Sequence, residues 1–192
     1  VPVLFERAFG SDSEGVAITP PLKLGSGANT VCIAGRIDRV DVGWTEQRPV
    51  FFVVDYKSGR RRTCDVDKLR AGEALQLVIY TLAVEKLGLL GQPVVPWYMG
   101  YWNLRENGFD AFSLGKRKTP LDAEAWNRIQ GYLDEVVARL VSRMRRAEFP
   151  VDSSDRNCTS QCDFRLGCRV AQVRSLPDSL DKQWDGRRPP EQ

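Results

Sequence analysis

The chain has 192 residues, 42% of them hydrophobic, with a formal net charge of +3 and no histidine. This length and hydrophobic content are typical of a single soluble domain with one sizeable core. Without an imidazole the chain cannot form a Ser-His-Asp triad, a Cys-His thiol hydrolase, a His-ligated zinc hydrolase or any histidine general base. Hydrolytic chemistry here would depend on carboxylates, lysine and a metal ion.

The sequence has no apolar run of the roughly 18 residues that a membrane span needs, and no secretory signal opens it. We therefore expect a cytoplasmic protein with no membrane partner. Because the first residue is Val1 rather than methionine, our working hypothesis is that the chain is part of a longer polypeptide. We expect residues 1–170 to form the folded domain and residues 171–192, which are rich in proline and charge, to form a polar tail or linker.

Two candidate strands end in acidic residues. Residues 31–41 carry Asp38, and residues 51–57 end in Asp55 and Lys57. Because side chains alternate between faces along a strand, Asp55 and Lys57 project from the same face, where burying charge is costly without a partner. Two acids and a lysine on adjacent strands can hold Mg²⁺ and a water molecule. An ordinary salt bridge at the mouth of a hairpin has the same pattern and is the alternative.

Basic residues follow the second strand directly. Gly59 permits a turn, and Arg60, Arg61 and Arg62 come next. The chain itself fixes the proximity of these arginines to Lys57, and a cation cluster beside the reacting groups suits DNA phosphates. Solvated surface charge is the alternative interpretation.

The second half of the chain predicts further helices and one strand. Residues 69–87 are expected to form a helix that stops at Gly88, with Gln76 and Tyr80 on one face because they are four apart. The aromatic-rich residues 94–105 predict a strand whose rings pack a helix against a sheet rather than stack on bases. From residue 120, apolar residues at helical spacing predict a long helix that ends before Pro150. This order indicates an α/β protein with a mixed sheet flanked by helices.

Three segments together resemble a known family. They are Gly35-Arg36-Ile37-Asp38-Arg39-Val40-Asp41, Val54-Asp55-Tyr56-Lys57-Ser58-Gly59 and Leu75-Gln76-Leu77-Val78-Ile79-Tyr80. In this order and spacing they resemble the PD-(D/E)xK nuclease superfamily and, more narrowly, the RecB-like nuclease domains, including those of AddB-type helicase-nuclease subunits. The resemblance implies a restriction-endonuclease-like α/β fold with a mixed central sheet flanked by helices.

The resemblance also implies roles for individual residues. Asp38 and Asp55 would be ligands of Mg²⁺ or Mn²⁺, Lys57 would be the catalytic lysine, and Gln76 and Tyr80 would support the site and the DNA. Glu6 is similar to an early glutamate of the family and would be a third metal ligand, with a solvated charge as the equal alternative. Many RecB-like nucleases contribute a histidine to the metal from a helix upstream of these motifs, and this chain has none.

Cysteine usage offers a second metal site. Cys158, Cys162 and Cys168 fall in one loop-like segment, and three clustered thiols in a cytosolic chain suggest metal ligation rather than disulfides. The resemblance to RecB-like and AddB-like nucleases implies a [4Fe-4S] cluster with a fourth cysteine upstream. We predict that the full-length protein carries the cluster and that this chain does not hold it intact. Neither remaining cysteine is predicted to be the fourth ligand, because Cys32 is expected in the core and the spacing of Cys64 from the other three does not require it to be one. Zinc and free cysteines are the alternatives.

The family resemblance implies a metal-dependent deoxyribonuclease, expected to be an exonuclease in recombination or double-strand-break repair. Its partners would be DNA and a helicase-like region or subunit. Two interpretations of other classes remain open. One is a non-catalytic nucleic-acid-binding or scaffold domain that keeps the nuclease fold. The other is a cysteine-based metal or redox module whose acidic residues are only structural.

Overall fold

A computed structural model of the chain describes residues 1–10, 19–59, 62–105, 108–113, 120–148 and 163. The chain divides into two units, Val1–Ser142 and Arg143–Gln192. The first unit carries every strand of the described residues. The predicted tail and the three clustered cysteines lie outside the described residues.

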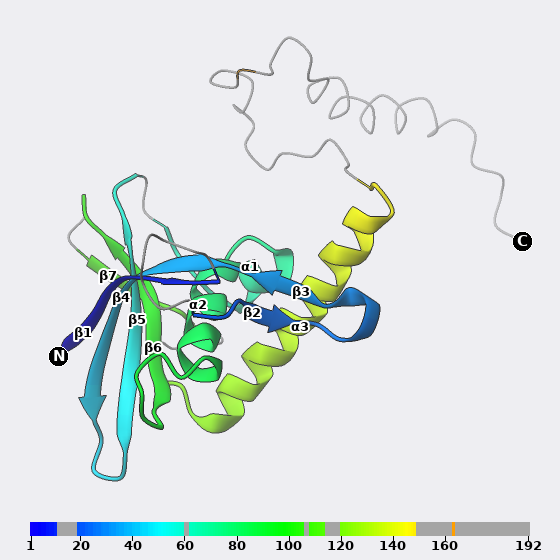
Figure 1. Ribbon diagram of the computed structural model, residues 1–192. Helices are drawn as coiled ribbons and strands as arrows, with labels where there is room; N and C mark the ends of the chain where they lie inside the picture. The colour runs from blue at the N-terminus through cyan, green and yellow to red at the C-terminus, as the bar shows by residue number, and fades with distance from the viewer. Residues whose placement is uncertain (11–18, 60–61, 106–107, 114–119, 149–162, 164–192) are drawn as a thin grey trace, which may run out of the picture. The chain divides into compact units, whose positions relative to one another are not determined.

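The central element is a mixed five-stranded sheet with the strand order β1-β4-β5-β6-β7 (Figure 1). Its strands are β1 Pro2–Phe9, β4 Gly35–Trp44, β5 Pro49–Lys57, β6 Val95–Asn103 and β7 Gly108–Ala111. Neighbouring strands are antiparallel except for β5 and β6, which are parallel. A parallel pair needs a crossover connection, and α1 and α2 supply it here.

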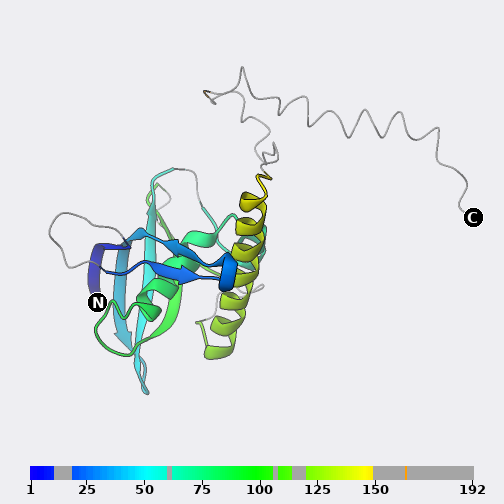
Figure 2. The same cartoon turned by 45° about the vertical axis from the view of Figure 1, so that its right-hand side comes forward.

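Helices cover one face of this sheet. In both ribbon views α2, Leu75–Lys86, lies between the sheet and the long helix α3, Ala123–Arg145 (Figures 1 and 2). A helix covered on two sides must be apolar almost all round, and α2 buries Leu77, Val78, Leu82 and Val84 together with two smaller residues. The predicted α/β fold with a mixed sheet and helices is therefore confirmed. Every helix among the described residues is too short or too polar to cross a lipid bilayer.

The structure replaces the predicted helix over residues 69–87 with two helices. Helix α1, Val66–Ala71, begins at Asp65, whose side chain accepts a hydrogen bond from the backbone N–H of Lys68 at 2.9 Å. It ends at Gly72, whose φ of 88° is the left-handed conformation that glycine adopts without a steric penalty. The apolar periodicity continues across this break, which is why the sequence pattern alone did not reveal it.

The predicted strand over residues 31–41 is also divided. It contributes β3, Val31–Ile33, which pairs with β2, Leu22–Leu24, in a separate two-stranded sheet, and then β4 of the main sheet. A short 3₁₀ helix, Gly27–Asn29, connects β2 and β3. Cys32 lies on the exposed side of this ribbon, so the prediction that it is a core residue is wrong. Cys64 is buried.

Candidate metal-dependent nuclease site

The aspartate of the Asp-x-Lys motif is buried beneath the helical layer. Asp55 lies near the end of β5, and its 1% exposure makes it one of four buried polar residues among those described. Strand alternation places Lys57 on the same face. Lys57 Nζ lies 2.5 Å from Asp55 Oδ2 in an ion pair, with the lysine side chain 26% exposed. The expected same-face arrangement of these two residues is therefore present.

The electrostatic environment of Asp55 favours a cation as its partner. Burial raises the pKa of the Asp55 carboxyl, Lys57 opposes that shift, and the negative charge of Asp38 adds to it. The buried Oδ2 atom has Lys57 Nζ, 2.5 Å away, as its partner, and no second donor reaches it among the described residues. A buried carboxylate oxygen with a single partner is costly, and a divalent metal ion is a further partner that would offset this cost.

The second aspartate lies on the neighbouring strand. Strands β4 and β5 are antiparallel and pair Arg39 with Val54, so Asp38 and Asp55 flank that pair on adjacent strands. Asp38 Oδ2 accepts a hydrogen bond from the backbone N–H of Tyr56 at 2.8 Å. The carboxylate of Asp38 is thereby held against the residue between Asp55 and Lys57.

Helix α2 supplies the polar support that the Gln-x-x-x-Tyr spacing predicts. Lys57 Nζ donates to Gln76 Oε1 at 3.0 Å, and Gln76 Nε2 donates to the Tyr80 hydroxyl at 3.1 Å. The ring of Tyr80 packs edge-on against Phe9, with 6.2 Å between the ring centroids. Gly35 makes room for this packing, because a Cβ atom there would lie 3.2 Å from the Tyr80 ring. The lysine is thus held from the helix side by a chain of two hydrogen bonds.

Two site residues were not predicted from the sequence, and both lie on β6. Tyr101 pairs with Asp55 in the parallel register, and its ring centroid lies 5.1 Å from Lys57 Nζ, a cation–π distance. Burial, followed by the charges of Cys64 and Asp55, raises the pKa of Tyr101 to about 12. Asn103 pairs with Lys57 in the same register and is 4% exposed. Strand alternation does place residues 99, 101 and 103 on one face of β6, but only the register with β5 shows that this face lies beside the Asp-x-Lys motif.

Of the predicted site residues that the structure describes, Glu6 is not brought to this cluster. Glu6 lies on β1 with a φ of 47°, is exposed, and faces Arg36 at 3.8 Å between their charged atoms. Arg60 and Arg61 lie outside the described residues, as do Cys158, Cys162 and Cys168, whose cluster therefore stays a prediction. Arg62 is described and exposed.

The donor set fits a hard divalent cation held by two carboxylates. Among the residues that the structure describes, no three acidic or cysteine side chains gather around a point that could hold a metal ion. The predicted third ligand, Glu6, is accordingly not assembled with Asp38 and Asp55. Mg²⁺ is commonly bound through one or two carboxylates, with water and substrate phosphate completing its coordination. The buried Oδ2 atom of Asp55, which has Lys57 as its one partner among the described residues, is the strongest structural indication of such a ligand.

Comparison with protein families shows where this arrangement belongs. The model of the PD-(D/E)XK nuclease superfamily matches residues 1–169, and the chain belongs to this superfamily. The five-stranded mixed sheet with its helices is the restriction-endonuclease-like α/β fold. The resemblance drawn from the three sequence motifs is therefore confirmed.

The curated relatives that the chain matches share one description, a subunit of an ATP-dependent helicase/deoxyribonuclease. The chain is 33% identical over 132 residues to the protein so described from Moorella thermoacetica, a match that covers 67% of this chain. It is 34% identical over 107 residues, 54% of the chain, to the protein of that name from Geobacillus kaustophilus. The protein of that name from Desulforudis audaxviator is 40% identical over 79 residues, 41% of the chain. These matches span 10%, 9% and 6% of the relatives' own lengths.

Proposed function

We propose that this chain is the nuclease domain of a larger helicase-nuclease-type protein and hydrolyses DNA phosphodiester bonds with Mg²⁺ or Mn²⁺. The observation that carries the proposal is the buried Asp55 carboxylate, whose Oδ2 atom has Lys57 as its one partner among the described residues and which lies near the negative charge of Asp38. Membership of a nuclease superfamily and relatives named as helicase/deoxyribonuclease components support the same chemistry.

Each residue of the cluster has a role in this proposal. Asp38 and Asp55 would hold the metal ion, which when bound supplies polarisation of a phosphoryl oxygen and a lowered pKa of a coordinated water. Lys57 presents an ammonium group beside Asp55, where it stabilises the negative charge that develops on the phosphate during hydrolysis. Gln76 fixes the direction of that ammonium group through its 3.0 Å hydrogen bond, and Tyr80 fixes Gln76 in turn. A lysine held in this way loses little conformational entropy at the moment of reaction.

The relatives' names suggest the biological setting. Because the relatives' names join a helicase to a deoxyribonuclease, we propose exonucleolytic cleavage in recombination or double-strand-break repair. The partners would be DNA and the helicase region or subunit, in the cytoplasm. An exonuclease needs a free end, so linear DNA should be degraded while covalently closed circular DNA of the same sequence stays intact.

A cleavage assay on the 192-residue chain tests the proposal. Linear single- and double-stranded DNA would be incubated with Mg²⁺, with Mn²⁺ and with EDTA, using Asp55→Ala as the variant and Asp134→Ala on the exposed side of α3 as the matched control. We expect Asp55→Ala to lose at least about 1,000-fold in rate, because metal-derived stabilisation of the transition state is worth several kcal/mol. Cleavage that survives both EDTA and Asp55→Ala would contradict the proposal.

A second candidate function is a DNA-binding domain that keeps the nuclease fold without the activity. Two observations favour it. The chain contains no histidine, and among the described residues only two carboxylates meet at the site. In that case DNA would bind with micromolar or better affinity, while cleavage would be absent with either metal and the Asp55→Ala and Lys57→Ala variants would bind like the wild type. A nuclease assay and a binding titration on the same samples separate the two functions.

A further inference from the structure

The Asn103 side chain holds the backbone of Arg62 at two points. Asn103 Oδ1 accepts a hydrogen bond from the Arg62 N–H at 2.9 Å, and Asn103 Nδ2 donates to the Arg62 carbonyl oxygen at 3.2 Å. Asn103 is 4% exposed, so its amide depends on these protein partners rather than on solvent. A side chain that binds both backbone groups of one residue fixes the position of that residue as a neighbouring strand would.

This clamp lies beside the candidate active site. Asn103 is the last residue of β6 and pairs with Lys57 in the parallel register. The next residue continues the contact, because the Leu104 N–H donates to the Lys57 carbonyl oxygen at 2.9 Å. Arg62 is therefore fixed at the end of the sheet where Asp55 and Lys57 lie. The positive charge of Arg62 also acts to lower the pKa of Tyr101, whose ring contacts Lys57.

The backbone that follows Arg62 is anchored as well. Cys64 is buried, and its carbonyl oxygen accepts a hydrogen bond from the Ser113 N–H at 3.2 Å. The Val66 N–H donates to the Ser113 carbonyl oxygen at 3.1 Å, and Asp65 forms a parallel bridge with Ser113. A residue held by a clamp on one side and by a bridge on the other cannot move far from the site. Its side chain is nevertheless exposed.

A fixed, exposed guanidinium is what recognition of a phosphodiester requires. Arginine presents a planar fork of donors that matches phosphate oxygens, and contacts to phosphate set the register of a nucleic acid on a protein. A solvated surface arginine needs no buried amide to hold its backbone. Burying an asparagine for this purpose is costly unless its hydrogen bonds are made, so the clamp indicates that the location of Arg62 matters.

We propose that Asn103 is a positioning residue that fixes Arg62 as a phosphate contact for the DNA strand at the Asp55–Lys57 site. This inference rests on the proposed function, since it assigns the substrate of that function to a particular cation. It assigns the role to Arg62 because of the clamp, and not merely because of its place in a run of arginines. Asn103 acts through Arg62 and touches no reacting atom.

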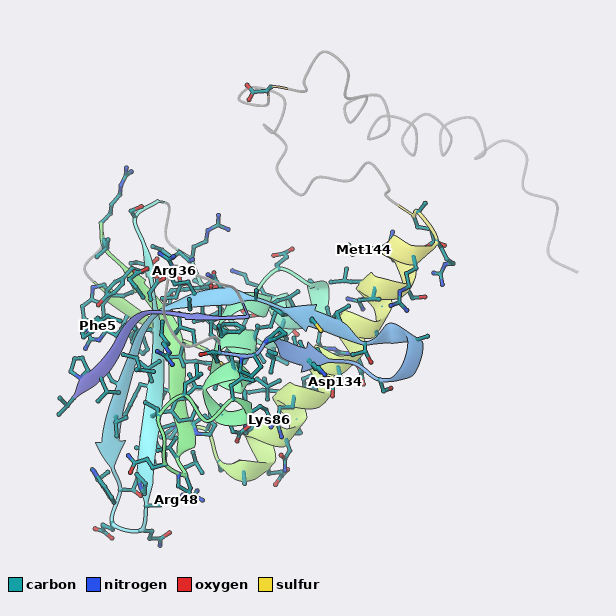
Figure 3. All side chains as sticks on the ribbon, viewed as in Figure 1. Phe5, Arg36, Arg48, Lys86, Asp134 and Met144 are labelled. Atoms are coloured by element: carbon teal, nitrogen blue, oxygen red, sulfur yellow. The ribbon has the colours of Figure 1, made fainter. Side chains whose placement is uncertain are left out.

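A double-mutant cycle on the full 192-residue chain tests the inference without cleavage. A fluorescein-labelled single strand of about 20 nucleotides, long enough to cover the binding groove of one small domain, would be titrated in EDTA buffer over a range of salt concentrations. The variants are Arg62→Ala, Asn103→Ala and the double variant. The control is Arg48→Ala, which removes the same charge at the tip of the β4–β5 hairpin, the end of β5 opposite to Lys57 (Figure 3).

We expect Arg62→Ala to weaken binding by about 3- to 10-fold and to reduce the slope of log affinity against log salt by about 0.7, the value for one phosphate contact on a single strand. Asn103→Ala should shift both quantities in the same direction. In the Arg62→Ala background it should cost nothing further, because its effect passes through Arg62. Arg48→Ala should leave both quantities unchanged. Arg62→Lys should restore the salt slope, since the charge is kept.

Three outcomes would overturn the inference. They are an Arg62→Ala variant that binds like Arg48→Ala, additive effects of the two substitutions, and an Arg62→Lys variant as weak as Arg62→Ala in both quantities. If thermal unfolding shows that Asn103→Ala does not fold, the Arg62 variants alone still test whether Arg62 contacts phosphate, because Arg62 is exposed and its substitution should not disturb the fold. Cleavage with Mg²⁺ is measured on the same proteins. If the Arg62 and Asn103 variants show coupled effects on binding but the protein does not cleave DNA, the nuclease proposal is refuted and this inference stands. If the protein cleaves DNA and neither binding nor cleavage depends on Arg62, the nuclease proposal stands and this inference is refuted.

Discussion

Two acid–base pairs with the same spacing lie on adjacent strands of the sheet, and their carboxylates differ in hydrogen bonding. On β4, Arg39 Nε donates to Asp41 Oδ1 and Arg39 Nη2 to Asp41 Oδ2, both at 2.6 Å, and Arg39 Nη1 donates to the Tyr56 hydroxyl at 3.0 Å. Both carboxylate oxygens are used, and the hydrogen bonds to Asp41 and then Tyr56 raise the pKa of Arg39. On β5, Lys57 Nζ lies 2.5 Å from Asp55 Oδ2, and no second donor reaches that oxygen among the described residues.

The two pairs also differ in their surroundings. Arg39 and Asp41 line an open groove of about 510 Å³ together with aromatic residues such as Phe52 and Trp102. Asp55, by contrast, is buried on the face that α2 covers. The difference teaches that an acid and a base two residues apart do not define a site. Burial, a carboxylate oxygen with one partner, and a lysine held by a third residue distinguish the pair that we propose to be reactive from the closed one.

Removing the cation of each pair in turn should give the largest difference between the two pairs. Lys57→Ala should reduce the rate of DNA cleavage by about 100- to 10,000-fold, the range for a positioned group that handles charge or protons in the transition state. Arg39→Ala should leave the rate within about threefold, because that pair is partly solvated and closed on itself. Steady-state cleavage of end-labelled DNA measures both. Equal losses in the two variants would abolish the distinction between the pairs.

Removing the helix-side support of Lys57 should have the next largest effect. Gln76→Leu deletes the acceptor of a charged hydrogen bond, which is worth about 1.5–3 kcal/mol, so the turnover number should fall by about 10- to 100-fold. The affinity for DNA should change little. Gln130→Leu on α3 is the matched control and should not affect turnover. A change confined to DNA affinity would instead indicate that Gln76 contacts the substrate.

The aromatic contact beneath Lys57 should contribute less. Tyr101→Leu removes a cation–π interaction of about 0.5–2 kcal/mol, which corresponds to about a 2- to 30-fold loss in turnover. Tyr101→Phe keeps the ring and should retain most of the activity. Thermal unfolding of both variants controls for general packing damage. If the phenylalanine and leucine variants lose the same activity, then the hydroxyl rather than the ring face matters.

The pairs should also differ in how pH affects stability without metal. Because burial raises the pKa of Asp55 above 3.8, the folded state holds the proton more tightly than the unfolded state does. The stability that this proton contributes is fully present below the unfolded-state value and is lost as the pH rises through the folded-state pKa. Asp55→Asn cannot ionise, so its free energy of unfolding relative to wild type should increase over that interval, by at most about 1.4 kcal/mol per pH unit.

The Arg39–Asp41 pair provides the control for this measurement of stability against pH. Asp41→Asn breaks a bidentate ion pair and should be less stable than the wild type at neutral pH, the opposite sign to Asp55→Asn. Urea unfolding in EDTA between pH 3 and 8 would measure all three proteins, a range set to bracket the ordinary carboxyl value of about 4. A wild-type protein more stable than Asp55→Asn throughout this range would mean that Lys57 outweighs the burial of Asp55.

Local spacing predicted part of the site correctly. The two-residue period of β5 places Asp55 and Lys57 on one face, and the four-residue spacing of Gln76 and Tyr80 places them on one side of α2. Both follow from backbone geometry, which a few consecutive residues determine. The pattern failed where a local conformation interrupts it. Gly72 ends a helix inside a continuous apolar stripe.

Contacts between strands that are distant in the sequence could not be predicted in this way. Asn103 lies 46 positions after Lys57, and only the parallel register of β5 and β6 brings them together. The same register selects Tyr101 from four aromatic residues that the sequence treats alike. Burial of Asp55 was expected from its apolar neighbours, but the lack of a second partner at Oδ2 depends on every group that packs around it.

The order of residues by itself determined which side chains share a face, which chemistry histidine's absence forbids and which superfamily the three motifs resemble, because these depend on identity and short-range geometry. The tertiary structure decided which pair of charges is buried, and which arginine a distant amide holds in place. Those outcomes depend on desolvation and on hydrogen bonds across the sheet, and neither exists until the strands have paired and α2 has covered them.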